Sequence, residues 1–120
     1  MHRPVAAAAR LDARLAPGRA AFNRGEFFAA HELWEDVWRG LAGDERTLAQ
    51  GLIQIAAGLH HLQHGRPRPA ARLLARGASK LSRAPATTLP VAALLHDVTR
   101  LLAALDTPGG DAPDPAAIRF

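Results

Sequence analysis

The segment from Leu48 to Leu59 constrains the fold more than any other part of this chain. Among its Ala, Gly, Leu and Ile residues, only Gln50 and Gln54 are polar. A helix that is apolar on nearly all sides must be surrounded by other helices or by lipid, and no apolar run here reaches the roughly 18 residues that a membrane span needs. We therefore expect a buried central helix near residues 45–64, with Asp44 as its N-cap.

Four further segments carry apolar side chains at the three- and four-residue spacing of amphipathic helices. Pro17 and Gly18 are expected to break or kink the first of them. The segments are Val5 to Leu15 with a short piece from Arg19 to Asn23, then Glu26 to Arg39, then a helix opened by Pro69 that reaches Leu81, and Val91 to Leu105. The sequence predicts an all-α fold, a single compact bundle of about five helices around the central one.

Length and composition fit one domain with one core, because 48% of the 120 residues are hydrophobic. We place this domain at residues 1–106. Residues 107–120 are rich in Pro and Gly and have too little apolar surface to offset the entropy of ordering, so we expect a disordered tail. With no membrane span and no start of the signal-peptide type, the expected location is the cytoplasm. Homodimerisation is also expected, through an apolar strip that the sequence does not locate.

The chain contains no Cys, which excludes disulfides, thiolate metal sites and a cysteine nucleophile. Any metal would have to be bound by His and carboxylate side chains. The net charge is +4, and no Asp or Glu occurs between Arg46 and His96. One side of the molecule should therefore be basic. On the fourth helix, the residues expected to line an outer face able to contact phosphates are Arg68, Arg72, Arg76, Lys80 and Arg83.

Polar side chains occur on the apolar faces of the second and third helices. At 100° per residue, His31 projects within about 60° of Trp34 and about 20° of Trp38, inside an aromatic face. Glu35 borders that face one turn later, whereas Glu32 points to solvent. On the third helix, a polar stripe is formed by Gln50, Gln54, Ala57 and His61, which project within about 60° of one another. Buried imidazoles and amides need hydrogen-bond partners, so we expect His31 and Glu35 to pack against Gln54 and His61.

These residues also resemble a known bacterial family, the domain of unknown function 309. The resemblance rests on the run from Phe22 to Phe28, His31-Glu32-Leu33-Trp34-Glu35 with Trp38, the run from Gln50 to Gln54, and His60-His61. It covers roughly residues 19–83. It implies a small helical bundle of uncharacterised activity, in which the signature positions are His31, Glu32, Glu35, Trp38 and Gln54. The segment before Pro17 and the Pro/Gly-rich tail lie outside the resemblance.

Three hypotheses follow, each with a structural alternative. The favoured one is a binding or interaction module for a protein or small molecule, with a polar site at His31, Glu32, Glu35, Trp38, Gln54 and His61. The second is a metal-dependent, hydrolase-like enzyme with a divalent metal on His31 and Glu35. Its alternative is a core histidine paired with a carboxylate, because the sequence His-Glu-x-x-Glu lacks the second His of metalloproteases. The third is nucleic-acid binding through the basic face; no aromatic residues interleave with those arginines, which favours an ordinary solvated surface. His60 and His64 are interpreted as helix-end residues that complement the helix dipole.

Overall fold

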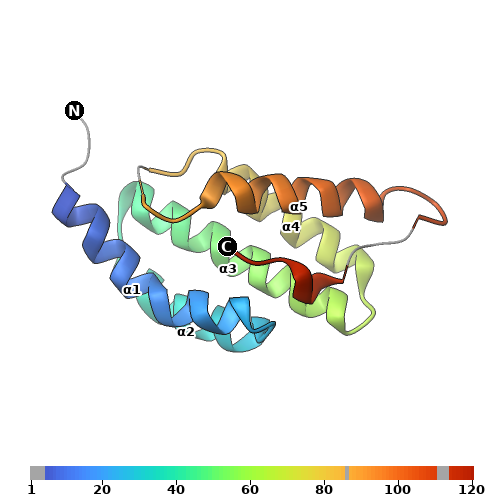
Figure 1. The fold of residues 1–120 in the computed structure, drawn as a ribbon, viewed down its shortest axis with the longest axis horizontal. Helices are drawn as coiled ribbons and strands as arrows, with labels where there is room; N and C mark the ends of the chain where they lie inside the picture. Colours follow the sequence, from blue (N-terminus) through green and yellow to red (C-terminus); the bar gives the residue numbers. More distant parts are fainter. Residues whose placement is uncertain (1–4, 86, 111–113) are drawn as a thin grey trace.

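The chain folds into five α-helices, one 3-10 turn and no strand over the residues that the computed structural model describes, 5–85, 87–110 and 114–120. The all-α fold class is confirmed (Figure 1). The central helix lies where the sequence predicts it, and the last helix matches its predicted bounds. The elements are α1 (Val5–Asn23), α2 (Phe27–Arg39), α3 (Gly43–Gln63), α4 (Pro67–Leu81), α5 (Val91–Leu105) and η1 (Pro115–Ala117).

Consecutive helices pack on one another, with α3 in the middle. The helix α3 lies between α2 and α4, while α1 packs on α2 and α5 packs on α4. Because α2 and α3 are joined by a short turn they run antiparallel: Phe28 contacts His60 at one end and Arg46 covers Trp38 at the other. This order leaves a line of α2 and α3 side chains at the junction of the two helices, where the candidate site lies.

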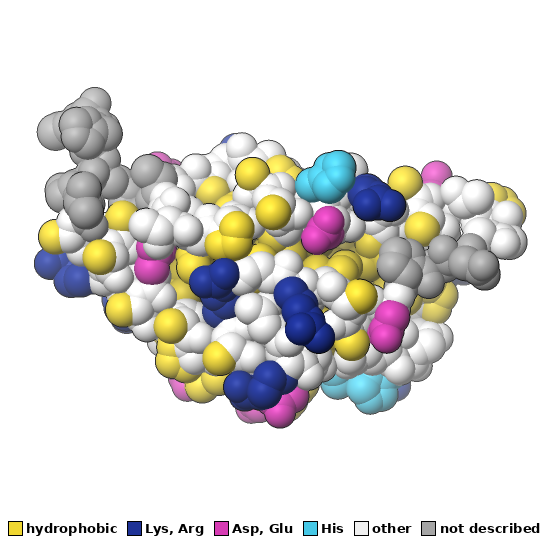
Figure 2. Space-filling model, viewed as in Figure 1, with side chains coloured by type: hydrophobic (Ala, Val, Ile, Leu, Met, Phe, Trp, Pro, Cys, Tyr) yellow, Lys and Arg dark blue, Asp and Glu magenta, His cyan; other side chains and the backbone are white. Residues whose placement is uncertain are grey.

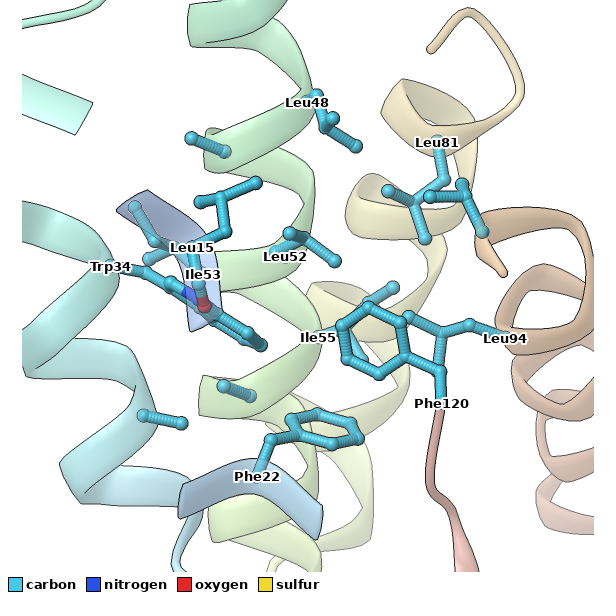
Figure 3. Packing of buried hydrophobic residues seen from close by; sticks show 14 of the residues in the cluster. Leu15, Phe22, Trp34, Leu48, Leu52, Ile53, Ile55, Leu81, Leu94 and Phe120 are labelled. Atoms are coloured by element: carbon cyan, nitrogen blue, oxygen red, sulfur yellow. The ribbon is translucent and has the colours of Figure 1, made fainter. Parts of the chain in front are cut away.

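The apolar side of α3 forms the centre of the core. Leu48, Leu52, Ile55 and Leu59 are fully buried, as the near-absence of polar residues in this segment predicts. Figure 3 shows their neighbours from α1, α2, α4 and α5 pointing toward the same cluster. Against α4 the approach is close enough to require glycine, since a Cβ on Gly77 would lie 2.6 Å from the Ile55 side chain.

The expected break at Pro17 and Gly18 is wrong, because α1 continues through both residues to Asn23. Pro17 costs this helix one backbone hydrogen bond. Leu15 and Phe22, one on each side of it, are both completely buried, and the burial of both ends outweighs that loss. Trp34 of α2 packs directly on Gly18, which holds the segment in line.

Two predicted helix starts also differ from the structure. Ala42, and not Asp44, occupies the N-cap position of α3, and Asp44 lies within the first turn, where a carboxylate complements the helix dipole. The helix α4 begins at Pro67 and not at Pro69. Both prolines fit the first turn, whose N–H groups have no partner within the helix. None of the described helices is long and apolar enough to cross a bilayer.

Residues 114–120 do not behave as the expected disordered tail. After the η1 turn, Ile118 and Phe120 are buried in the core at 5% and 7% exposure. Figure 1 shows this last segment lying across α3 between α1 and α5. The side-chain amide of Asn23 fixes the backbone of this segment through two hydrogen bonds. It donates to the Phe120 main-chain oxygen (3.1 Å) and accepts from the Phe120 N–H (2.9 Å). The composition of the tail does not reveal this packing, because the two buried residues, Ile118 and Phe120, are isolated in a polar segment. Residues 111–113 of the predicted tail lie outside the described residues.

Candidate functional site

His31 and Glu35 form the centre of the polar site. They are one turn apart on α2, and the helix places His31 Nε2 at 3.2 Å from Glu35 Oε1. Their side chains are 25% and 40% exposed, so the pair is accessible from solvent. Glu32, which the family resemblance also implies, is exposed on the outer surface of α2, as its projection predicts.

An exposed aromatic ring flanks this pair. Phe28 is 53% exposed, and its ring stacks on His31 with centroids 5.9 Å apart and planes 19° apart. The same ring contacts His60 of α3 at 5.4 Å. A large apolar side chain left half in water beside an accessible acid–imidazole pair offers a ligand an apolar surface next to polar groups.

The carboxyl end of α3 contributes further imidazoles. The rings of His60 and His64 lie 4.3 Å apart, and those of His60 and His61 lie 6.2 Å apart. His64 also pairs through Nδ1 with the His60 main-chain oxygen at 2.9 Å. Burial lowers the pKa of His60 below its ordinary value, and the neighbouring charges of His64, His61, Arg66 and His31 lower it further. We call the seam the following set: Phe28, His31, Glu35 and Trp38 of α2 with His60, His61 and His64 of α3.

Three nitrogen atoms of the seam are buried and have no hydrogen-bond partner among the described residues: His31 Nδ1, Trp38 Nε1 and His61 Nδ1. Trp38 is otherwise well packed, because the Arg46 guanidinium lies 4.0 Å from its ring. A buried polar atom without a partner costs roughly 1–3 kcal/mol, and most native proteins contain few of them. All three atoms belong to residues of the seam.

Gln54 does not join this site in the way we expected. Its side-chain oxygen accepts a 2.9 Å hydrogen bond from Lys80 Nζ of α4, so the partner of this amide lies on the opposite side of α3 from α2. The helical projection places Gln54 and His61 in one stripe, but it does not reveal which neighbouring helix supplies a partner. The expected packing of Gln54 against His31 and Glu35 is therefore wrong, and Gln54 instead links α3 to α4.

Over the part of the chain that the structure describes, His31 and Glu35 have no third partner for a metal. Among the described residues, no group of three His, Asp or Glu side chains is arranged to hold a metal ion. Metal sites in helical bundles and catalytic zinc sites use at least three protein ligands. Within the described residues, the nearby histidines His31, His60, His61 and His64 form no such group either.

The predicted basic face of α4 is divided. Lys80 is turned toward Gln54, whereas Arg68 and Arg72 line a groove between α4 and α5. Arg76 and Arg83 are exposed. On the face drawn in Figure 2, basic, acidic and apolar side chains are interspersed, so that face carries no large patch of one charge.

Sequence reasoning missed Phe28, His60 and His64 as parts of the site. Phe28 was grouped only with the family motif, and the two histidines were interpreted as helix-end residues. The short connection between α2 and α3 could have predicted these contacts. It makes the two helices antiparallel, so the first turn of α2, with Phe28, lies beside the last turn of α3, with His60 and His64. That His31, Glu35, Trp38 and His61 form one site stays a prediction from the helical projection.

Comparison with known proteins supports the resemblance noted in the sequence. Residues 15–73 match the model of the family described as "Domain of unknown function (DUF309)". This range contains every residue of the candidate polar site. A protein of Aquifex aeolicus (strain VF5), described as "Uncharacterized protein", is 32% identical over 66 residues, which is 54% of this chain and 20% of that protein. The chain thus spans about a fifth of that relative's length. No solved structure matches.

Proposed function

Because residues 15–73 of this chain match the model of the domain of unknown function 309 family and include the whole seam, we propose that the chain is a small binding module whose site is this seam. The observation that carries the proposal is the set of buried nitrogen atoms without partners, on His31, Trp38 and His61. Each lowers the stability of the free protein, and a ligand that supplies the missing partners recovers that free energy on binding.

The chemistry of the seam indicates what such a ligand contains. The indole N–H of Trp38 is only a donor, so it requires an acceptor oxygen. The Glu35 carboxylate accepts donors and repels anions, which disfavours a ligand carboxylate beside it. An amide supplies both an acceptor and a donor. Phe28 provides an exposed apolar face about 15 Å along α2 from Trp38, so the best-fitting ligand is an elongated amide-bearing molecule whose apolar part reaches Phe28.

A metal-dependent enzyme is the weaker hypothesis, since the pair of His31 and Glu35 has no third ligand within the described part of the chain. A cytoplasmic location and a homodimer remain predictions from the sequence. Light scattering on an eluting size-exclusion peak tests the dimer: a mass near twice 12.8 kDa supports it, and a mass near 12.8 kDa excludes it under those conditions.

A fragment screen observed through the histidine rings tests the proposed function. Imidazole carbon–proton NMR signals of His31 and His61 report on the seam, and that of His96, exposed on α5, is an internal control. The library consists of small primary and secondary amides. The proposal predicts saturable shifts of the His31 and His61 signals without a shift of His96, abolished in His31→Leu. A library that shifts none of these signals, or all three equally, would contradict it.

A further inference from the structure

A hollow of the described surface lies between the first half of α4 and the last turn of α5. It has a volume of about 830 Å³, within the roughly 300–1,000 Å³ of typical ligand pockets. Figure 1 places these two helices side by side, and α3 separates them from α2. Its lining consists of Pro67, Arg68, Ala71, Arg72, Ala75, Leu102, Ala103, Leu105 and Asp106.

The groove combines an apolar floor with a cationic rim. Its floor is made of alanines from α4 and of Leu102 and Leu105 from α5, which are only partly buried although α5 packs on α4. On the α4 side stand Arg68 and Arg72, both exposed, and among the described residues neither forms an ion pair. The amino-terminal end of α4 lies beside Arg68 and adds to the positive potential there.

This arrangement does not suit a nucleic acid. A polyphosphate backbone is bound by a run of cations along a polar surface. Here the run is interrupted, because Lys80 is engaged with Gln54 while Arg68 and Arg72 border Ala and Leu side chains. Two free guanidinium groups next to an apolar trough match a ligand with one anionic end and a hydrocarbon body.

We propose that the groove binds a monomeric long-chain fatty acid. Its carboxylate pairs with Arg68 and Arg72, since guanidinium groups bind carboxylates through two parallel hydrogen bonds. Its chain lies over Ala71, Ala75 and Leu102. Asp106 lines the α5 side and keeps the carboxylate on the α4 side. This site is separate from the seam, so it does not depend on the function proposed above.

Calorimetric titration of the full chain at pH 8 tests the site, with decanoate, dodecanoate and tetradecanoate each below the concentration at which it forms micelles. We expect one site per chain and about tenfold or greater tightening from decanoate to tetradecanoate, because half-burying four more methylenes contributes at least that much. Dodecyltrimethylammonium, with the same tail length and the opposite charge, should bind at least about tenfold more weakly than dodecanoate.

Two variant pairs localise the binding. Replacing both rim residues (Arg68→Gln with Arg72→Gln) should weaken dodecanoate binding at least about tenfold, whereas Arg83→Gln, exposed beyond the groove, should change it less than about twofold. Filling the floor with Ala75→Leu should weaken binding similarly, and Ala93→Leu at an exposed α5 position should not. Absence of saturable binding by all three acids, equal effects of variants and controls, or binding only to anionic vesicles would overturn the proposal.

Discussion

The indole of Trp34 occupies the space that a side chain on Gly18 would need. Its Nε1 donates a 3.1 Å hydrogen bond to the Leu15 main-chain oxygen, which brings the ring against the backbone of α1. A Cβ placed on Gly18 would lie 2.3 Å from that nitrogen. This contact fixes α2, and with it the seam, on α1.

Replacing Gly18 with Ala should therefore destabilise the protein, although Ala is the better helix former by about 1 kcal/mol. We expect a net loss of about 2 kcal/mol in the free energy of unfolding, because the buried indole must shift or give up its hydrogen bond. Guanidinium unfolding titrations measure it. Pro17 and Ala16 are exposed neighbours, and Ala16→Gly is the matched control that reports helix propensity alone. A neutral or stabilising Gly18→Ala would refute the contact as the reason for glycine.

The last residues should contribute to global stability. Phe120 packs edge-on against Phe22, with centroids 5.3 Å apart, and lies 6.1 Å from Trp34. Phe120→Ala should lower the free energy of unfolding by about 3 kcal/mol, as for other buried phenylalanines. The neighbouring Arg119 is exposed, so Arg119→Ala should change it by less than about 0.5 kcal/mol. Equal, small effects of the two substitutions would mean that this segment is not part of the core in solution.

Local patterns in the sequence predict most of the fold but less of the site. The bounds of α5 and the burial of α3 follow from apolar spacing alone. The continuity of α1 through Pro17 depends on Trp34, which is distant in sequence, and the ordering of Phe120 depends on Asn23. Likewise, a helical projection places Gln54 on a face but does not indicate that Lys80 reaches it. The misses are tertiary contacts that override local propensity.

The low pKa of His60 should make stability depend on pH. Its pKa is lowered by burial first, then by His64, His61, Arg66 and His31. Protons therefore bind more readily to the unfolded chain, and stability falls as the pH drops from about 6.5, the ordinary value, toward the lower folded pKa. In melts at pH 7.5 and 5.0, His60→Gln should lose less stability on acidification than the wild type. His96→Gln is the matched control, and a wild-type-like loss in His60→Gln would contradict this assignment.

Metal analysis should give a negative result at the His31–Glu35 pair. With two ligands in place and no third among the described residues, the pair should hold a divalent ion only weakly. Elemental mass spectrometry on untagged protein purified without chelators should find well below one metal per chain, unchanged in His31→Ala. One tightly held metal per chain that disappears in His31→Ala would instead support the metal-dependent enzyme.

The measurement that most directly tests the central claim is the free energy of unfolding of His61→Leu, determined by guanidinium titration beside His96→Leu. If the seam is a binding site whose buried Nδ1 lacks a partner, removing that atom and adding a better helix former should stabilise the protein by about 1 kcal/mol. The exposed His96→Leu should change stability by less than about 0.5 kcal/mol. A loss of about 1 kcal/mol or more in His61→Leu would show instead that this imidazole belongs to a structural hydrogen-bond network.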